Sequence, residues 1–229
     1  MSDHPDHDHH GEDGHGRSLK DIHEDVPPDY YDTSLKTNLI QRVYHNRRFD
    51  GICELVSKTP GAVLDVGCDG GTLLERIADK AKPSRVVALD LAAESVVYTV
   101  GKRPDFDGLV GDGEGLPFRD GAFDAIFCSE VLEHVERPDR LFAEFRRCLS
   151  PNGYAVVAVP RETPLFKFLW FFWTRFGKGK VWRHAHVQEF SLDSLDGLIA
   201  TAGFKKVEDK LLLIGMVRAV RISPTQIAN

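Results

Sequence analysis

Acidic residues follow or end three short apolar runs in the first half of the chain. Asp65 precedes a glycine-rich turn, Asp90 ends the second run, and Asp112 follows the third. A carboxylate at the end of the second run can accept hydrogen bonds from both hydroxyls of a ribose. An acid after the next run can receive the amino group of an adenine, so the ordered set indicates an adenosine site. As an alternative, Asp90 could cap the helix that follows it.

The turn after the first run reads Leu64-Asp65-Val66-Gly67-Cys68-Asp69-Gly70-Gly71. Glycine allows the backbone to approach a ligand closely, and the start of the next helix offers unpaired N–H groups. The turn is not a G-x-G-x-x-G sequence, which argues against the pyrophosphate site of a nicotinamide dehydrogenase.

Candidates for proton transfer lie further along, in Glu130-Val131-Leu132-Glu133-His134. His134 and Glu130 follow the fourth apolar run and could act as general bases. Each has a structural alternative, because a histidine can close a helix and an acid can cap one. Four further residues are candidates to face a substrate: Tyr30, Tyr31, His184 and His186. The tyrosines could instead pack on the domain, and His186 could fix its own loop.

Apolar runs alternate with helical patterns through the middle of the chain. The runs lie at 62–66, 85–90, 109–110, 123–128 and 154–159, with helical patterns at about 73–77, 92–101 and 138–149. This alternation predicts a parallel sheet built from βαβ units. After a helix at about 191–202, strands near 204–213 and 215–222 are joined too tightly for a crossover helix, so we expect them to pair antiparallel.

The first 57 residues contain two segments of different composition, a polar acidic one and one with apolar residues at helical spacing. Residues 1–25 hold eight acids and two bases, and we expect them to form a disordered acidic tail. Six of the ten histidines lie in this tail, where they could hold a divalent metal loosely or simply be solvated; no structured metal centre is predicted. Residues 34–57 indicate two helices, with apolar residues at roughly helical spacing: Leu35, Leu39, Val43, Ile52, Leu55 and Val56.

Composition narrows the class of protein. The 229 residues are 42% hydrophobic, which is enough for a core, and no apolar stretch reaches the roughly 18–20 residues that cross a bilayer. The tail accounts for the whole net charge of −6, because residues 26–229 balance 27 acids with 27 bases. A neutral body argues against nucleic-acid binding. Four widely spaced cysteines argue against a disulfide framework and favour a cytoplasmic protein.

Residues 161–183 are the most unusual stretch. They contain all three tryptophans and six bases against one acid. Dense aromatics flanked by Lys and Arg are typical of a helix lying in a membrane interface, so Leu165–Phe176 could contact a membrane surface. The alternative is a buried helix or a dimer interface. If the membrane interpretation holds, the cytoplasmic protein would sit peripherally at the inner membrane face.

Five ordered segments resemble the class I S-adenosylmethionine-dependent methyltransferases, in particular the branch that methylates quinones, lipids and other small molecules. The segments cover about residues 60–204 and are LDVGCDGG (64–71), ALD (88–90), GDGEGLPF (111–118), FDAIFCSEVLEHV (123–135) and RCLSPNGYAVVAVP (147–160). The resemblance implies a set of residues for S-adenosylmethionine: Asp65, Gly67 and Gly71 for the methionine end, Asp90 for the ribose, Asp112 and Gly113 for the adenine, and Ser129 beside the methyl group. Asp69 and Leu91 complete the predicted cofactor-binding residues. One departure is Asp69, which stands where the family usually has glycine; Asp tolerates left-handed angles, so the turn can survive.

The resemblance also implies an architecture and an activity. The fold would be α/β and Rossmann-like: a doubly wound, mostly parallel seven-stranded sheet with an antiparallel C-terminal strand pair. After the tail, the methyltransferase domain would consist of four segments in order. These are N-terminal cap helices (26–59), a cofactor-binding half (60–160), a helical insert (161–190) and a C-terminal helix and strand pair (191–229). The implied activity is methyl transfer from S-adenosylmethionine to a small or lipid-like acceptor. The alternative is a non-catalytic cofactor-binding or scaffold member of the same fold.

Overall fold

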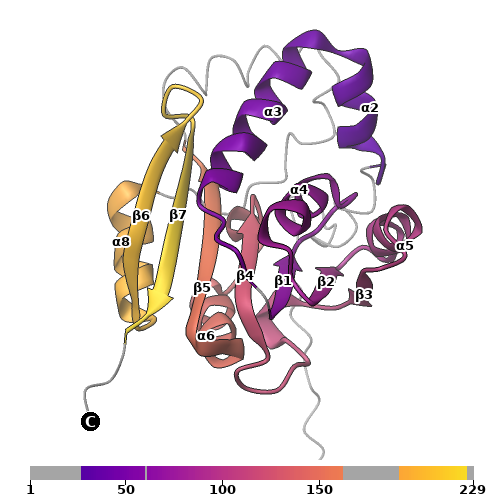
Figure 1. Ribbon diagram of the computed structural model, residues 1–229. Coiled ribbons are helices and arrows are strands. Elements are labelled where there is room, and N and C mark those ends of the chain that lie inside the picture. The colour runs from indigo at the N-terminus through magenta and orange to yellow at the C-terminus, as the bar shows by residue number, and fades with distance from the viewer. Residues whose placement is uncertain (1–26, 60, 162–190, 226–229) are drawn as a thin grey trace, which may run out of the picture.

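The computed structural model describes residues 27–59, 61–161 and 191–225 (Figure 1). The acidic tail 1–25, the membrane-contact candidate Leu165–Phe176 and the substrate candidates His184 and His186 lie outside the described residues.

Seven strands form one sheet in the order β3-β2-β1-β4-β5-β7-β6. The first five run parallel, and β7 pairs antiparallel with both β5 and β6, as the short final connection predicted. The strands are β1 (Ala62–Val66), β2 (Arg85–Asp90), β3 (Asp107–Val110), β4 (Phe123–Ser129), β5 (Leu149–Pro160), β6 (Phe204–Leu212) and β7 (Val217–Pro224). Strand order reverses between β1 and β4, the point of an open α/β sheet where ligands bind outside the carboxyl ends of the strands.

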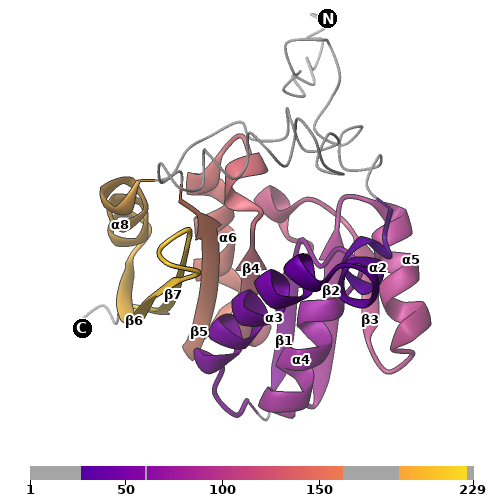
Figure 2. The same ribbon diagram turned by 90° about the horizontal axis from the view of Figure 1, so that it is seen from above.

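Helices cover both faces of this sheet (Figure 1). They are α2 (Tyr30–Thr37), α3 (Leu39–Glu54), α4 (Thr72–Ala81), α5 (Ala93–Lys102), α6 (Pro138–Cys148) and α8 (Leu192–Thr201), with short 3₁₀ turns η1 (Gly113–Gly115) and η2 (Leu132–His134). Helices α6 and α8 pack on one face, and α3 and α4 on the other. Seen from above, α2 lies beside α5, and α3 crosses over α4 (Figure 2).

In the central strands, successive side chains are buried on opposite faces of the sheet, which explains why the sequences of these strands are continuous apolar runs. In β4, Ile126 and Cys128 join the core on the α6 side, whereas Ala125 and Phe127 join the core on the α4 side. Both faces of a parallel sheet are covered by helices, so both sets of alternate side chains are predominantly apolar.

The N-terminal region forms two helices, as predicted, but the first of them begins before residue 34. Helix α2 begins at Tyr30, so Tyr30 and Tyr31 form its first turn rather than preceding it. Asn38 separates α2 from α3, and its side chain accepts hydrogen bonds from the N–H groups of Ile40 (3.0 Å) and Gln41 (3.1 Å).

The apolar spacing along α3 does not define a single buried face. Phe49 and Ile52 are buried against the domain, but Leu39 is 65% exposed and Val43 is 46% exposed. Helix α3 therefore has one face buried against the domain and another that exposes aliphatic side chains.

Candidate functional site

The glycine turn after β1 has a backbone that other residues would disrupt. Gly67 has φ of +76°, and a Cβ there would overlap Cγ2 of Val131. Gly71 has φ of +74°, and a Cβ there would lie 2.6 Å from Cγ2 of Thr99. Asp69 adopts φ of +46°, as expected for an acid that tolerates left-handed angles. The turn therefore presents bare backbone at the carboxyl end of β1, where a ligand can approach closely.

Asp90 ties this turn to the start of α5. Its Oδ2 accepts a hydrogen bond from the N–H of Asp69 (2.9 Å), and its Oδ1 accepts one from Ala92 (2.9 Å). Ala92 is the capping residue of α5, so Asp90 supports the helix start without being its cap. Each carboxylate oxygen can accept more than one hydrogen bond, so the proposed ribose contacts are compatible with this local role.

Three carboxyl groups crowd the turn. Burial and the nearby charges of Asp90 and Asp69 raise the pKa of Asp65 well above its usual value. Burial and the charge of Asp90 raise the pKa of Asp69 to about 7. Mutual repulsion in a partly dry site makes a cationic ligand favourable there, because a positive charge would offset it. The sulfonium and ammonium groups of S-adenosylmethionine fit this requirement.

We expect Asp69→Asn to flatten the dependence of stability on pH between about 4 and 7. In that range the unfolded chain ionises Asp69 while the folded chain keeps its proton, so the folded state binds more protons. Its stability must then fall as pH rises, with a slope of at most about 1.4 kcal/mol per pH unit. Urea denaturation at several pH values measures this. Asp79→Asn, at an exposed position on α4, is the control and should keep the parent slope.

The proposed adenine corner lies after β3. Oδ1 of Asp112 accepts the N–H of Glu114 (2.9 Å) at the start of η1, and the Asp112 side chain is exposed. Gly113 is packed so closely that a Cβ would lie 2.7 Å from Cδ1 of Leu141. Leu91 follows Asp90 and is 38% exposed, so an apolar side chain stands open beside the two acids. Leu116 is part of the core cluster and does not form an exposed wall.

The N-terminal cap is fastened over the glycine turn. The carbonyl oxygen of Pro28 lies so close to Gly70 that a side chain there could not fit. Asp32 of α2 accepts hydrogen bonds from Thr72 of α4 (2.8 Å) and Tyr98 of α5 (2.9 Å), and pairs with Lys102 at 2.8 Å. Burial alone would raise the pKa of Asp32, but these bonds outweigh burial and lower it. Sequence reasoning did not single out Asp32.

A buried ion pair joins the cap to the end of β4. Arg48 of α3 pairs with Glu130, and its guanidinium carbon lies 5.2 Å from the ring centre of Tyr31. The Tyr31 ring also makes an edge contact with His45, at 4.8 Å between centroids. Arg48 was missed at the sequence level, although an arginine on the same helical stripe as Ile52 and Leu55 was a usable signal.

Four polar side-chain atoms around this pair are buried and have no hydrogen-bond partner within the described residues: Nδ1 of His45, Nε of Arg48, Oγ of Ser129 and Oε2 of Glu133. Burial, and secondarily Arg48, lowers the pKa of His45 to about 3, so its imidazole is neutral. Burial and the charge of Glu130 raise the pKa of Glu133 well above its usual value. Buried polar atoms are nearly always paired, so this cluster is suited to a polar ligand.

The two general-base candidates have different environments. Glu130 has φ of +56°, an uncommon backbone for a non-glycine residue, and its carboxylate is engaged by Arg48. The Glu130 carboxylate is already committed to the guanidinium of Arg48, which counts against a role as general base. His134 is buried in η2, with Nε2 at 4.0 Å from Oε1 of Glu133. His134 therefore stays the better candidate for proton transfer.

Of the tyrosines, Tyr31 lies within the site and Tyr30 beside it. Burial raises the pKa of Tyr31, whose environment includes Arg48, Glu130 and Asp69. The hydroxyl of Tyr30 is 3.5 Å from Oε1 of Gln41, on α3.

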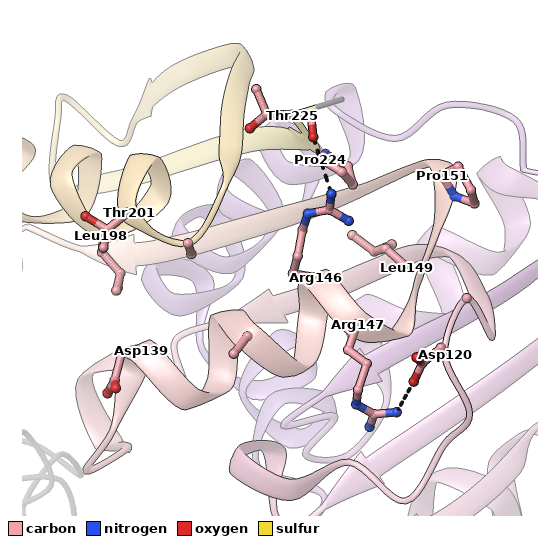
Figure 3. A pocket seen from close by; sticks show the side chains of 13 residues that line it. Asp120, Asp139, Arg146, Arg147, Leu149, Pro151, Leu198, Thr201, Pro224 and Thr225 are labelled. Atoms are coloured by element: carbon pink, nitrogen blue, oxygen red, sulfur yellow. Dashed lines mark hydrogen bonds and ion pairs between the residues drawn. The ribbon is translucent and has the colours of Figure 1, made fainter. Parts of the chain in front are cut away.

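A large surface hollow of about 1100 Å³ lies elsewhere, alongside α6 and α8 (Figure 3). It reaches the amino ends of β4 and β5, the edge of the sheet opposite the glycine turn. Arg147 on its wall is engaged by Glu144, Asp120 and two carbonyl groups, and Arg146 donates to the carbonyl of Thr225. The side chains of Arg146 and Arg147 are therefore occupied by contacts within the protein and are not available to bind a ligand. For this reason the hollow is not the candidate site.

Residues 64–157 match the family model of the methyltransferase domain. The chain is 37% identical over 137 residues to the demethylmenaquinone methyltransferase of Renibacterium salmoninarum, covering 59% of this chain and 55% of that protein. It is 31% identical over 159 residues to the malonyl-[acyl-carrier protein] O-methyltransferase of Geobacter sulfurreducens, covering 65% and 57%. A Thermotoga maritima structure described as a SAM-dependent methyltransferase, possible histamine N-methyltransferase, superimposes with a TM-score of 0.67 at 20% identity, covering 90% of this chain and 99% of that one.

The match over residues 64–157 and these relatives support a class I S-adenosylmethionine-dependent methyltransferase, with S-adenosylmethionine as its cofactor. The seven-stranded Rossmann-like sheet with its antiparallel C-terminal pair agrees with that class of fold. The matches span less than two thirds of the curated relatives, 55% and 57% of the two proteins named above. Within the described residues, every helix is too short or too polar to cross a membrane.

Proposed function

We propose that this chain transfers the methyl group of S-adenosylmethionine to a small or lipid-like acceptor. One observation carries the proposal: the glycine turn, Asp90 and Asp112 follow three neighbouring parallel strands and meet at one edge of the sheet. The three crowded carboxyl groups suit a cationic cofactor, and the residues present therefore fit it.

The cofactor supplies an activated methyl group on its sulfonium, so the protein mainly has to align the acceptor. In this proposal Asp90 holds the ribose and Asp112 the adenine, while Ser129 lies beside the methyl group. Arg48 holds the Glu130 carboxylate in place, and Glu133, whose pKa burial raises well above its usual value, donates a hydrogen bond to an acceptor oxygen when it carries a proton. His134 accepts a proton if the acceptor must lose one.

A lipid-like acceptor is favoured by the relatives and by the insert sequence. One relative is named for a quinone and another for an acyl group on a carrier protein. Leu165–Phe176 combines dense aromatics with flanking bases, a composition suited to a membrane interface. We therefore propose a peripheral position at a membrane surface, on its cytoplasmic side.

We expect Trp170→Ser with Trp173→Ser to reduce methylation of a lipid-like acceptor without weakening cofactor binding. The two indoles would anchor the insert in an interface, and the proposed cofactor residues belong to other segments. The measurement is methyl-label transfer into a cell lipid extract, with S-adenosylhomocysteine affinity from calorimetry as control. If the insert is instead a buried helix, the melting temperature should collapse, because truncating a buried tryptophan costs about 3–5 kcal/mol.

The same labelling experiment tests the reaction itself. Incorporation of label into a lipid or metabolite, with the product identified by mass, is the expected result. Tight binding of S-adenosylhomocysteine with no product from any extract would favour the non-catalytic scaffold. Absence of binding would reject the proposed function altogether.

A further inference from the structure

Helix α3 carries an outer face opposite to the one that holds Arg48 and His45. Leu39, Ile40 and Val43 are 65%, 82% and 46% exposed on this face. His45, Arg48 and Phe49 are buried on the inner side, which faces the candidate site. The helix is thus one wall of the site, and its aliphatic back is open to the surroundings. We call Leu39, Ile40, Val43 and Arg47 the outer face of α3.

The N-terminal half of the outer face is flanked by basic residues alone. Arg42 and Arg47 are exposed on α3, and Lys36 is exposed on α2. No acidic residue occurs from Thr33 to Phe49. The acids at the far end of α3 are already paired, Asp50 with Arg76 at 3.0 Å and Glu54 with Lys210 at 2.5 Å. Lys36, Arg42 and Arg47 have no ion-pair partner among the described residues. Aliphatic side chains next to such bases complement a bilayer, which is apolar inside and can be anionic at its boundary.

A second exposed aliphatic residue stands on the β6–β7 turn. Ile214 is 90% exposed and has φ of +57°, between Leu213 at +53° and Gly215 at +81°. A β-branched residue rarely adopts the left-handed region, and such strain persists only where the surrounding structure holds it. Here Arg161 donates to the carbonyl oxygen of Gly215 (3.1 Å) and fixes the turn.

The turn and α3 lie at the same end of the molecule. Both stand at the upper end in Figure 1, where the parallel strands finish, and they lie near each other in Figure 2. A Cβ at Gly51 of α3 would meet the side chain of Leu212, which immediately precedes the turn. The turn therefore lies beside the C-terminal half of α3, at the same end of the molecule as the outer face.

We propose that the outer face of α3 and the Ile214 turn together dock on an anionic lipid bilayer. The bases would meet lipid phosphates while the aliphatic side chains enter the acyl boundary. Since the inner side of α3 walls the candidate site, docking would bring that site to the bilayer surface. Docking itself does not depend on the proposed methyl transfer; only the delivery of an acceptor from the bilayer rests on that function.

The test uses the full chain and two kinds of vesicle, pure phosphatidylcholine and an equimolar mixture with phosphatidylglycerol. We expect the parent protein to sediment with the anionic vesicles, and salt to weaken this binding. L39S/I40S/V43S should lower the apparent affinity at least about tenfold, since three aliphatic side chains lose their burial. Val97→Ser, a 68% exposed aliphatic on α5, is the matched control and should bind as the parent does.

Ile214→Gly provides an independent variant that cannot be dismissed as misfolded. Glycine removes the left-handed strain, so the melting temperature should stay the same or rise while vesicle binding weakens severalfold. Three results would overturn the proposal: no binding of the parent to anionic vesicles, variants that bind like the parent, or a concentration-dependent dimer that L39S/I40S/V43S abolishes. Calorimetry with S-adenosylhomocysteine on every variant separates these outcomes from failure of the proposed function.

Discussion

Arg48→Met is expected to cause the largest loss of stability, about 3–5 kcal/mol in the free energy of unfolding. Arg48 is almost fully buried and Glu130 is mostly buried, so the substitution leaves a carboxylate in a poorly solvated place without its partner. Burial and the charge of Glu130 already raise the pKa of the neighbouring Glu133 well above its usual value. Urea denaturation at neutral pH measures the loss.

A double-mutant cycle shows whether the ion pair is responsible. Glu130→Gln alone leaves the buried guanidinium uncompensated, whereas the combined variant removes both charges and should lose clearly less than the sum of the single losses. Arg85→Met serves as the matched control, because Arg85 and Asp107 form an exposed pair at 2.7 Å and should contribute at most about 1 kcal/mol. Additive losses in the cycle would contradict the assigned role of the pair.

Asp90→Asn is expected to weaken the binding of S-adenosylhomocysteine by about 10- to 100-fold, equivalent to about 1–3 kcal/mol. The amide keeps the size of the side chain but has one acceptor oxygen in place of two. One of the N–H groups of Asp69 and Ala92 would then face an NH₂ group, and a ribose would lose a charged acceptor. Isothermal titration calorimetry measures the affinity.

Two comparisons make this result specific. Asp112→Asn should have a smaller effect, because Asp112 is exposed and adenine also gains apolar contact. Asp107→Asn, at an exposed position outside the site, should leave the affinity at the parent value. Unchanged affinity in both the Asp90 and Asp112 variants would mean that the cofactor lies elsewhere.

The substitutions Arg48→Met and Asp90→Asn examine opposite sides of the same site. Asp90 fixes the glycine turn from the sheet, while Arg48 reaches the end of β4 from the N-terminal cap. Asp32 links these sides, since it fastens α2 to the start of α4 and to α5. Cofactor affinity and cap stability are therefore expected to be coupled, and variants on either side should be measured for both.

The sequence by itself determined the order of the strands and helices from Ala62 to Pro160 and the acids that follow the strands. These features are local: an apolar run buried on both faces, a turn that needs glycine, and an acid at the end of a strand can each be read within a few residues. The final antiparallel pair was also predictable, because a connection of a few residues cannot hold a crossover helix.

Only the tertiary structure decided how the N-terminal cap completes the site. The pairing of Arg48 with Glu130 joins residues 82 positions apart, and neither sequence neighbourhood signals the other. The apolar spacing in α3 could not distinguish Leu39 and Val43, which are exposed, from Ile52, which is buried, because helical periodicity does not say which neighbour each face meets. Long-range packing of α3 on the domain made that choice, and with it placed a buried polar cluster on one side of the helix and an aliphatic surface on the other.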